Sequence, residues 1–249
     1  MGKLDGKVAL VTGSGRNIGR ATVLKLAAEG ANVVVNARSN EAEAEAVARE
    51  ARALGVKALP VLADVAYRDQ VEQMVAKAMA EFGAIDILIN NAAIRPHKPF
   101  TELTVDDWET VRGVVLDGAL YCTRAVINSM VENRYGRILF FTGEGAFGGG
   151  ARRAHVSAAK MGLVGLARSL ASEFAAHNIR VNVVSPGSID TTRANPEWYQ
   201  GRAPTAEGIP LQRQGTIDEI AATCLFLVSD DSGFITGQTI HANGGVAYH

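Results

Sequence analysis

The chain has 249 residues, of which 47% are hydrophobic and 20% charged, a composition that favours one α/β domain over two small ones. Its 25 Lys and Arg residues stand against 26 Asp and Glu residues, for a formal net charge of −1. This balance argues against the strongly basic face that nucleic-acid binding requires, so we expect no nucleic-acid partner.

The two cysteines and the first residues of the chain indicate in which cellular compartment the protein is found. Cys122 and Cys224 lie far apart within apolar segments, which predicts buried free thiols in a reducing environment rather than a disulfide framework or a zinc site. The first strand begins without an apolar signal segment, and no uncharged run of 18 residues follows. We expect a cytoplasmic protein with no membrane segment and no metal site.

Short runs rich in β-branched residues alternate with longer segments of helical pattern. Strands are expected at residues 7–12, 31–36, 56–62, 85–90, 136–142, 179–185 and 237–242. Nearly continuous apolar strands separated by helices are typical of a parallel sheet covered on both faces. The prediction is a single doubly wound, Rossmann-type α/β domain over residues 1–249, with a mostly parallel seven-stranded sheet and helices on both faces.

One segment, at about residues 188–212, fits neither pattern. It is rich in Pro and Gly, yet it carries Trp198 and Tyr199. Long loops in compact domains are usually functional lids or binding loops, with a frayed loop as the alternative. We expect a lid that brings Trp198 to the substrate region.

The first strand runs into the sequence TGSGRNIGR, and a helix is expected from about Asn17. Glycines at positions 13, 15 and 19 permit a tight turn and a close approach of the backbone to a ligand. The helix N-terminus then offers N–H groups and the positive end of its dipole to a pyrophosphate. A glycine-rich turn can also be a simple connection between a strand and a helix, so the neighbouring motifs must show whether it binds a ligand.

The second strand ends in VVVNARSN, where dinucleotide folds that select an unphosphorylated ribose carry an acidic residue. Here Ala37 is followed by Arg38 and Ser39, and Arg16 stands in the glycine turn. Arginine suits a ribose 2′-phosphate, although both arginines are equally understandable as solvated surface charges. NADP is therefore the expected cofactor, with NAD as the other possibility.

Taken together, these motifs resemble those of the short-chain dehydrogenase/reductase family over essentially the full length, and in particular its 3-oxoacyl-ACP-reductase-like members. The turn is similar to the family's T-G-x-x-x-G-x-G, with Asn17 for the middle glycine; asparagine tolerates positive φ. The resemblance also covers Asp64-Val65, NNAA at 90–93 and SPGSIDT at 185–191. It implies an NAD(P)-dependent oxidoreductase whose cofactor contacts Gly13, Gly15, Arg16, Asn17, Ile18, Gly19, Arg38, Ser39, Asp64, Val65, Asn91, Ala92, Lys160 and Ile189.

The family's chemistry depends on an asparagine, a serine and a Tyr-x-x-x-Lys pair, and three of these four residues differ here. VSAAK resembles the family's YSAAK, so Lys160 is the family lysine and Val156 takes the place of the tyrosine. By spacing, the serine position falls on Gly143 and the asparagine position on Val115.

In the family, the tyrosine exchanges a proton with the substrate oxygen while hydride moves, and the lysine also contacts the nicotinamide ribose. Valine neither donates nor accepts a proton. General acid–base catalysis contributes about 10² to 10⁴-fold in rate, so ordinary carbonyl reduction is expected to be severely impaired. Lys160 keeps its ribose contact and is the one catalytic residue carried over.

Other residues are candidates for the substrate region. Glu144 follows the serine position, and a carboxyl group in an apolar pocket has a raised pKa; an exposed Glu144 is the alternative. His97 lies in a loop that lines the substrate pocket in family members, or it is simply exposed. His155 adjoins Val156, but neighbours on a helix point about 100° apart, so it is the least favoured.

Three functions remain open from the sequence. The first is an NADP-binding oxidoreductase with a non-standard active site that transfers hydride to a small carbonyl, imine or enone substrate. The second is a catalytically silent cofactor-binding subunit or sensor, and the third a non-redox lyase or isomerase that uses Glu144 as base. The helices that the family uses for its four-subunit assembly remain apolar, so we expect a homotetramer or a hetero-oligomer with a related subunit.

Overall fold

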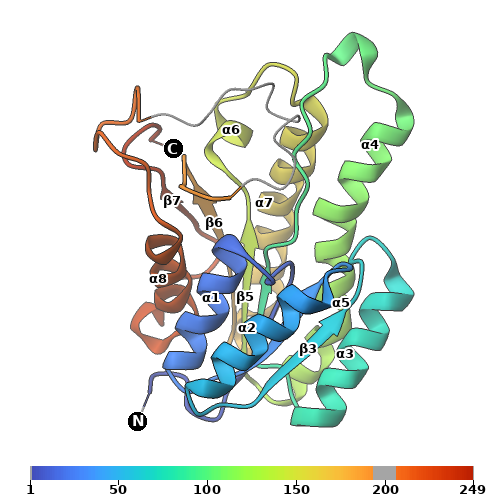
Figure 1. Cartoon of the computed structure of the whole chain (residues 1–249), viewed down its shortest axis with the longest axis vertical. Helices are drawn as coiled ribbons and strands as arrows, with labels where there is room; N and C mark the ends of the chain where they lie inside the picture. The colour runs from blue at the N-terminus through green and yellow to red at the C-terminus, as the bar shows by residue number, and fades with distance from the viewer. Residues whose placement is uncertain (1, 193–205, 249) are drawn as a thin grey trace.

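The computed structural model describes residues 2–192 and 206–248, and its centre is one parallel sheet (Figure 1). The seven strands are ordered β3-β2-β1-β4-β5-β6-β7, and each neighbouring pair is parallel. They are β1 Val8–Val11, β2 Asn32–Ala37, β3 Ala58–Leu62, β4 Ile87–Asn90, β5 Gly136–Phe141, β6 Ile179–Pro186 and β7 Thr239–Ala242. The predicted doubly wound architecture and all seven predicted strands are confirmed.

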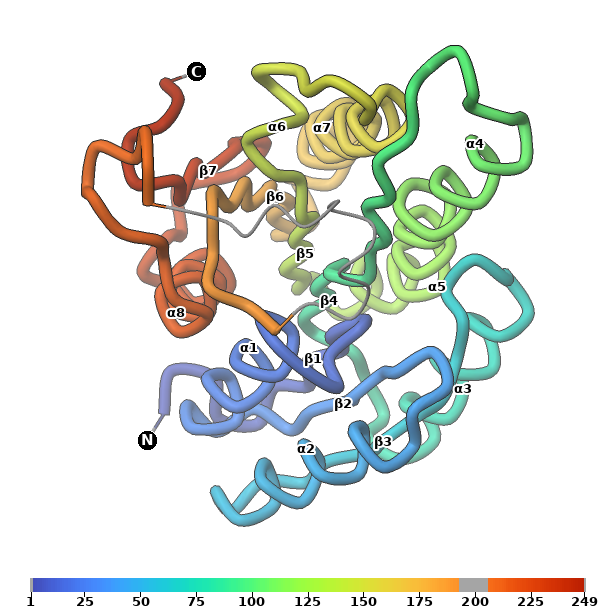
Figure 2. The backbone as a smooth tube through the Cα atoms, turned by 45° about the horizontal axis from the view of Figure 1, so that its top comes forward, coloured from blue at the N-terminus to red at the C-terminus, as the bar shows by residue number. Residues whose placement is uncertain are grey.

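Helices cover both faces of the sheet. Figure 2 shows α1 and α8 on one side of the strands and α5 and α7 on the other. The helices are α1 Asn17–Ala28, α2 Glu41–Ala53, α3 Arg68–Phe82, α4 Val105–Arg112, α5 Gly118–Glu132, α6 Glu144–Phe147, α7 Ala154–Phe174 and α8 Ile217–Val228. One apolar core lies between the sheet and α3, α5 and α7, and a second lies between the sheet and α1, α2 and α8.

The alternating direction of side chains along each strand explains why an apolar core forms on both faces of the sheet. Val33 and Val35 of β2 belong to the core beside α1 and α8, whereas Val34 belongs to the core beside α5 and α7. Successive side chains of a strand point to opposite faces, so a continuous apolar run supplies both layers. Cys122 and Cys224 are buried free thiols, one in each core, and burial raises the pKa of each to about 12.

Helices α4 and α5 are joined by a π-helical turn at Gly113–Asp117. The continuous helical stretch Val105–Glu132 is long and apolar enough to cross a membrane by length and composition. It packs one face into the core between the sheet, α3 and α7, as the core helix of a globular protein does. Isolated π turns in proteins often mark functional sites, and this one holds Val115.

The strand order reverses between β1 and β4, because β2 pairs with one edge of β1 and β4 with the other. In open α/β sheets, ligands bind outside the carboxyl ends of the strands at such a switch point. The turns after β1, β4, β5 and β6 meet there, and they carry most of the residues that the sequence selected.

Candidate cofactor and active site

The turn after β1 has the geometry of a phosphate cradle. Gly13 has φ +61° and Asn17 has φ +50°, so the asparagine adopts the positive φ expected of it. A Cβ on Gly19 would lie 2.6 Å from the carbonyl oxygen of Gly13, which excludes any side chain there. Helix α1 begins at Asn17, and the side chain of Arg16 at its N-cap makes no capping bond to the first N–H groups of the helix. This arrangement fits a pyrophosphate.

Asn36, which the sequence analysis did not single out, holds this turn in place. Its Oδ1 accepts a hydrogen bond from Gly13 N at 3.0 Å, and its Nδ2 donates to Ala63 O at 3.0 Å. Its own N–H donates to Ser14 Oγ at 3.1 Å. An amide directly after three consecutive valines of β2 was the signal in the sequence, because a polar group at the end of so apolar a run is expected to be buried and hydrogen-bonded.

Thr12 connects the ends of β1 and β4. Its Oγ1 accepts hydrogen bonds from Asn91 N and Ala92 N, each at 3.0 Å. The Asn91 side chain donates to Thr12 O at 2.9 Å and to Gly13 O at 3.0 Å. Asn91 therefore fixes the glycine turn with its side-chain amide.

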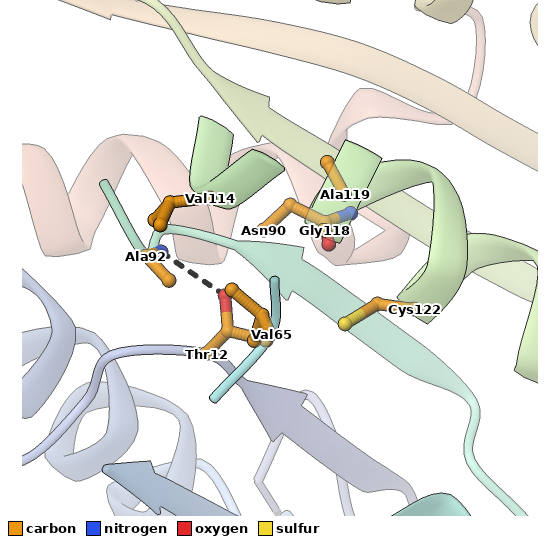
Figure 3. A pocket seen from close by; sticks show the side chains of 8 residues that line it. All are labelled: Thr12, Val65, Asn90, Ala92, Val114, Gly118, Ala119 and Cys122. Atoms are coloured by element: carbon orange, nitrogen blue, oxygen red, sulfur yellow. Dashed lines mark hydrogen bonds between the residues drawn. The ribbon is translucent and has the colours of Figure 1, made fainter. Parts of the chain in front are cut away.

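A narrow recess lies beneath this junction, between the sheet and α5. Figure 3 shows Thr12, Val65, Asn90, Ala92, Val114 and Cys122 around it, with the bond from Ala92 to Thr12 drawn. Its empty volume is about 150 Å³, but it has no space for a water-sized sphere. We interpret it as a gap in packing, not as a ligand site.

A carboxylate that the sequence analysis did not single out lies where the adenosine of a dinucleotide is expected. Arg16, Arg38 and Ser39 are exposed there, as a site for a 2′-phosphate requires. A Cβ on Gly15 would lie 3.3 Å from Oε2 of Glu43, so the acidic side chain lies against the glycine turn. Asn40 caps α2 by accepting from Glu43 N at 3.1 Å, which fixes this first helical turn.

The remaining residues expected at the cofactor have structural contacts of their own. Asp64 Oδ1 accepts from Ala66 N at 3.0 Å and closes the turn after β3, where Val65 is buried. Ile18 and Ile189 are partly buried against the core beside α1 and α8. Ile189 also forms a parallel bridge with Gly215.

Lys160 is buried at the end of β5. Its Nζ donates a hydrogen bond to the carbonyl oxygen of Phe141 at 2.5 Å, and the residue is 5% exposed. Burial, and then the positive charges of Arg95 and Arg153, lower the pKa of this amine to about 7. Lys160 is therefore held by β5, and within residues 2–192 and 206–248 its amine has no hydrogen bond to a tyrosine.

The positions of the other three family residues are apolar or lack a side chain. Val156 is 2% exposed and belongs to the core, on the same face of α7 as Lys160. Val115 is buried within the π-helical turn. Gly143 is extended, and a Cβ there would meet Pro186 O at 3.7 Å, an ordinary contact.

Glu144 is the acidic group that enters this region. It begins α6 and is partly buried, and its Oε2 is enclosed with no hydrogen-bond partner among the described residues. A Cβ on Gly187 would lie 3.0 Å from this oxygen, so the carboxyl group lies beside the 185–191 segment. Burial raises the pKa of Glu144, although the charge of Arg153 opposes the shift. The structure therefore supports a partly buried Glu144 and not the fully exposed side chain that was the alternative.

The histidines differ in placement. His155 is buried on α7, and burial is the main cause that lowers its pKa. The charge of Asp107 on α4 opposes this shift, and the charge of Lys98 in the loop after β4 adds to it. His97 is partly buried in the loop after β4, which is tied to the loop before α7 by a bond from Lys98 N to Arg152 O at 2.8 Å. Trp198, and with it residues 193–205 of the expected lid, lies outside the described residues.

Comparison with known proteins agrees with this geometry. Residues 13–247 match the family described as enoyl-(acyl carrier protein) reductase. The 3-oxoacyl-[acyl-carrier-protein] reductase of Staphylococcus epidermidis is 39% identical over 240 residues, which cover 96% of this chain and 98% of that protein. The 3-oxoacyl-[acyl-carrier-protein] reductase of Synechocystis sp. is 38% identical over 247 residues, 99% of either chain.

A solved structure extends the likeness to three dimensions. The protein from Sinorhizobium meliloti 1021 described as a short-chain alcohol dehydrogenase superposes with a TM-score of 0.91 at 33% sequence identity. The superposition covers 98% of this chain and 97% of the other. The likeness therefore includes the whole sheet and both helical layers.

Proposed function

The chain belongs to the short-chain dehydrogenase/reductase family, and we propose that it is an NADP-binding oxidoreductase with a non-standard active site. One observation carries the proposal. Lys160 is seated on Phe141 O at the end of β5, while the aliphatic Val156 occupies the position expected of the family's proton donor. Burial of this lysine, which has no phenol partner in the part of the chain that the structure describes, is understandable if its remaining task is to hold the cofactor.

The dinucleotide would be held by the glycine turn, the N-terminus of α1 and Lys160. Bound there, a nicotinamide dinucleotide supplies a hydride to the substrate. Arg16 and Arg38 favour the 2′-phosphate of NADP, whereas Glu43 beside Gly15 favours a free ribose. We propose NADP as the main cofactor and NAD as a second one.

We assign the proton transfer to Glu144. Burial raises its pKa above the usual value of a carboxyl group, which is the direction that a general acid requires. Its Oε2 lies beside Gly187, in the segment that resembles the family's nicotinamide contact. Val156 then supplies an apolar wall in place of a proton donor. A small carbonyl, imine or enone is the substrate class that this arrangement suits.

The test is the consumption of NADPH across a panel of small ketones, imines and enones. We expect turnover with at least one compound, and a loss of about 10²-fold or more in Glu144→Gln, which keeps the side-chain volume but cannot act as an acid. Glu173→Gln, an exposed change on α7, is the matched control and should leave turnover unchanged. Absence of turnover across the panel, in protein that binds NADPH, would overturn the assignment.

Two observations favour a second candidate, a catalytically silent subunit. Val156 and Val115 are both packed in the core, and the exposed apolar side chains of Leu120 on α5 and Met161 on α7 suit an assembly through these helices. Light scattering would show whether the chain forms a homotetramer. Coexpression with a tyrosine-bearing relative would show whether it prefers a mixed oligomer. The cytoplasmic location remains a prediction.

The third candidate, a lyase or isomerase with Glu144 as base, draws on the same raised pKa. It differs from the oxidoreductase in its readout. Product would form without any change in nicotinamide absorbance, and the reaction would still depend on Glu144.

A further inference from the structure

The loop between β4 and α4 carries His97, a candidate residue of the substrate region. The described residues 91–99 form a loop without helix or strand, and Figure 2 shows this segment running from β4 past α7 before it turns into α4. Its near end borders the glycine turn, where Thr12 Oγ1 accepts hydrogen bonds from Asn91 N and Ala92 N. The position of His97 therefore depends on what holds the far end of the 91–99 loop.

The main chain of Lys98 joins the far end of the loop to the segment before α7. Lys98 N donates a hydrogen bond to the carbonyl oxygen of Arg152 at 2.8 Å. Arg152 lies two residues before α7 begins and four residues before Val156. The bond therefore places the loop against the helix that carries both Val156 and Lys160.

The side chain of Lys98 joins the same point to the first turn of α4. Its Nζ donates to Oδ2 of Asp107 at 2.5 Å. The same carboxylate oxygen accepts from Thr104 N at 2.9 Å and from Thr104 Oγ1 at 2.6 Å, within the capping box of α4. The side chains of Lys98 and Asp107 are 34% and 32% exposed, so water and salt screen this ion pair less than a fully exposed one.

From these contacts we infer that Lys98 is a positioning residue for the substrate, because it fixes the 91–99 loop, and with it His97, against α4 and α7. The inference rests on the proposed function for the reaction and adds a residue that shapes the substrate side of the site. Thr12 holds the near end of the loop independently of Lys98. Loss of the Lys98 side chain should therefore loosen the far end and leave the end beside the cofactor in place.

A loosened loop weakens substrate binding in a definite way. If the loop is in its binding position for only a fraction of the time, the apparent affinity for the substrate falls by that fraction. Loss of a partly shielded ion pair changes such an equilibrium by about fivefold. The dinucleotide does not share this loss, because its contacts lie at the end of the loop that Thr12 holds.

Hydrogen–deuterium exchange, followed by mass spectrometry with and without NADPH, tests the inference without turnover. In Lys98→Met, which removes the charge and keeps much of the side-chain length, the amides of residues 93–99 should exchange about fivefold faster than in the wild type. Exchange of residues 8–19 around the glycine turn should not change. Lys98→Arg keeps a cationic donor and should restore the slow exchange. Equal exchange of the loop in Lys98→Met and in the wild type would overturn the inference.

Kinetics with a substrate from the panel then separate positioning from general stability. At saturating NADPH, Lys98→Met and Asp107→Asn should each raise KM about fivefold with kcat and NADPH affinity unchanged. The double variant should raise KM no further, because both changes remove the same ion pair. Asp106→Asn, an exposed change in the same turn of α4, is the matched control and should leave KM unchanged.

The outcomes distinguish the inference from the proposed function. A fall in kcat with an unchanged KM, or additive effects of the two changes on KM, would show that Lys98 does not position the loop for the substrate. Absence of turnover across the panel would overturn the proposed function, and the exchange measurement would still decide whether Lys98 fixes the loop.

Discussion

The side chain of Asn17 is hydrogen-bonded in both directions to the backbone of Thr192. Its Nδ2 donates to Thr192 O at 2.8 Å, and its Oδ1 accepts from Thr192 N at 3.0 Å. Asn17 begins α1 in the glycine turn, and Thr192 follows the 185–191 segment after β6. The residue at the family's middle-glycine position thus joins the glycine turn after β1 to the segment that follows β6.

Removal of this link should weaken cofactor binding. Asn17→Gly keeps the positive φ free of strain but deletes both bonds, each worth about 1 kcal/mol or less at this exposed site. We expect NADPH to bind roughly fivefold more weakly, as measured by fluorescence titration. Thr192→Ala is the control, because both bonds use only the backbone atoms of Thr192, which the substitution keeps. An unchanged affinity in Asn17→Gly would show that the link has no part in holding the dinucleotide.

Glu43 should set the balance between the two cofactors. Its carboxylate lies against Gly15, where a 2′-phosphate would feel its negative charge. Glu43→Gln should strengthen NADPH binding by about fivefold with little effect on NADH, since one partly screened repulsion of about 1 kcal/mol is removed. Glu41→Gln, an exposed change in the same helical turn, is the matched control. A parallel change for both cofactors would contradict this role.

The sequence predicted the fold because the fold follows from local pattern. Runs such as residues 31–36 are apolar on both faces, and glycines 13 and 19 are required by backbone geometry. Contacts between distant segments were not predictable in this way. Glu43 reaches Gly15 across 28 positions, and the amide of Asn36 joins three elements that no spacing connects.

The charge state of the site also depends on three-dimensional placement. The sequence identified Lys160, but the low pKa of its amine arises from burial together with Arg95 and Arg153, which lie on other loops. For Glu144 the sequence left both a buried and an exposed carboxyl group possible. In the structure Glu144 begins α6, and its carboxyl group is partly buried beside Gly187. The apolar identity of Val156, in contrast, was evident from one motif.

Lys160 should make the stability of the protein depend on pH. Its amine has a pKa of about 7 when folded and about 10.5 when unfolded, so between these values the unfolded chain binds a proton that the folded chain does not. The free energy of unfolding should therefore rise with pH by up to about 1.4 kcal/mol per unit between pH 7 and 10.

Urea denaturation of the cofactor-free protein at pH 7, 8 and 9 measures this slope. Lys160→Met should abolish the contribution and be more stable than the wild type at pH 7, because no charge is buried. Lys77→Met, on an exposed position of α3, should keep the slope of the wild type. The same slope in Lys160→Met as in the wild type would contradict the low pKa.

Restoration of two of the three missing polar groups, the serine and the tyrosine, should create a ketone reductase. A Cβ on Gly143 would meet nothing closer than Pro186 O at 3.7 Å, so a serine fits there without displacing the backbone. Position 156 lies one helical turn before Lys160, so a phenol placed there shares the face of the amine, whose proximity favours the phenolate. The double variant Gly143→Ser, Val156→Tyr should therefore reduce simple ketones about 10²-fold faster than the wild type.

The pair Gly143→Ser, Val156→Phe has the same ring without the hydroxyl and should show no gain. A folded tyrosine variant that binds NADPH yet reduces ketones no faster than its phenylalanine counterpart would mean that the loss of the phenol is not what limits this site.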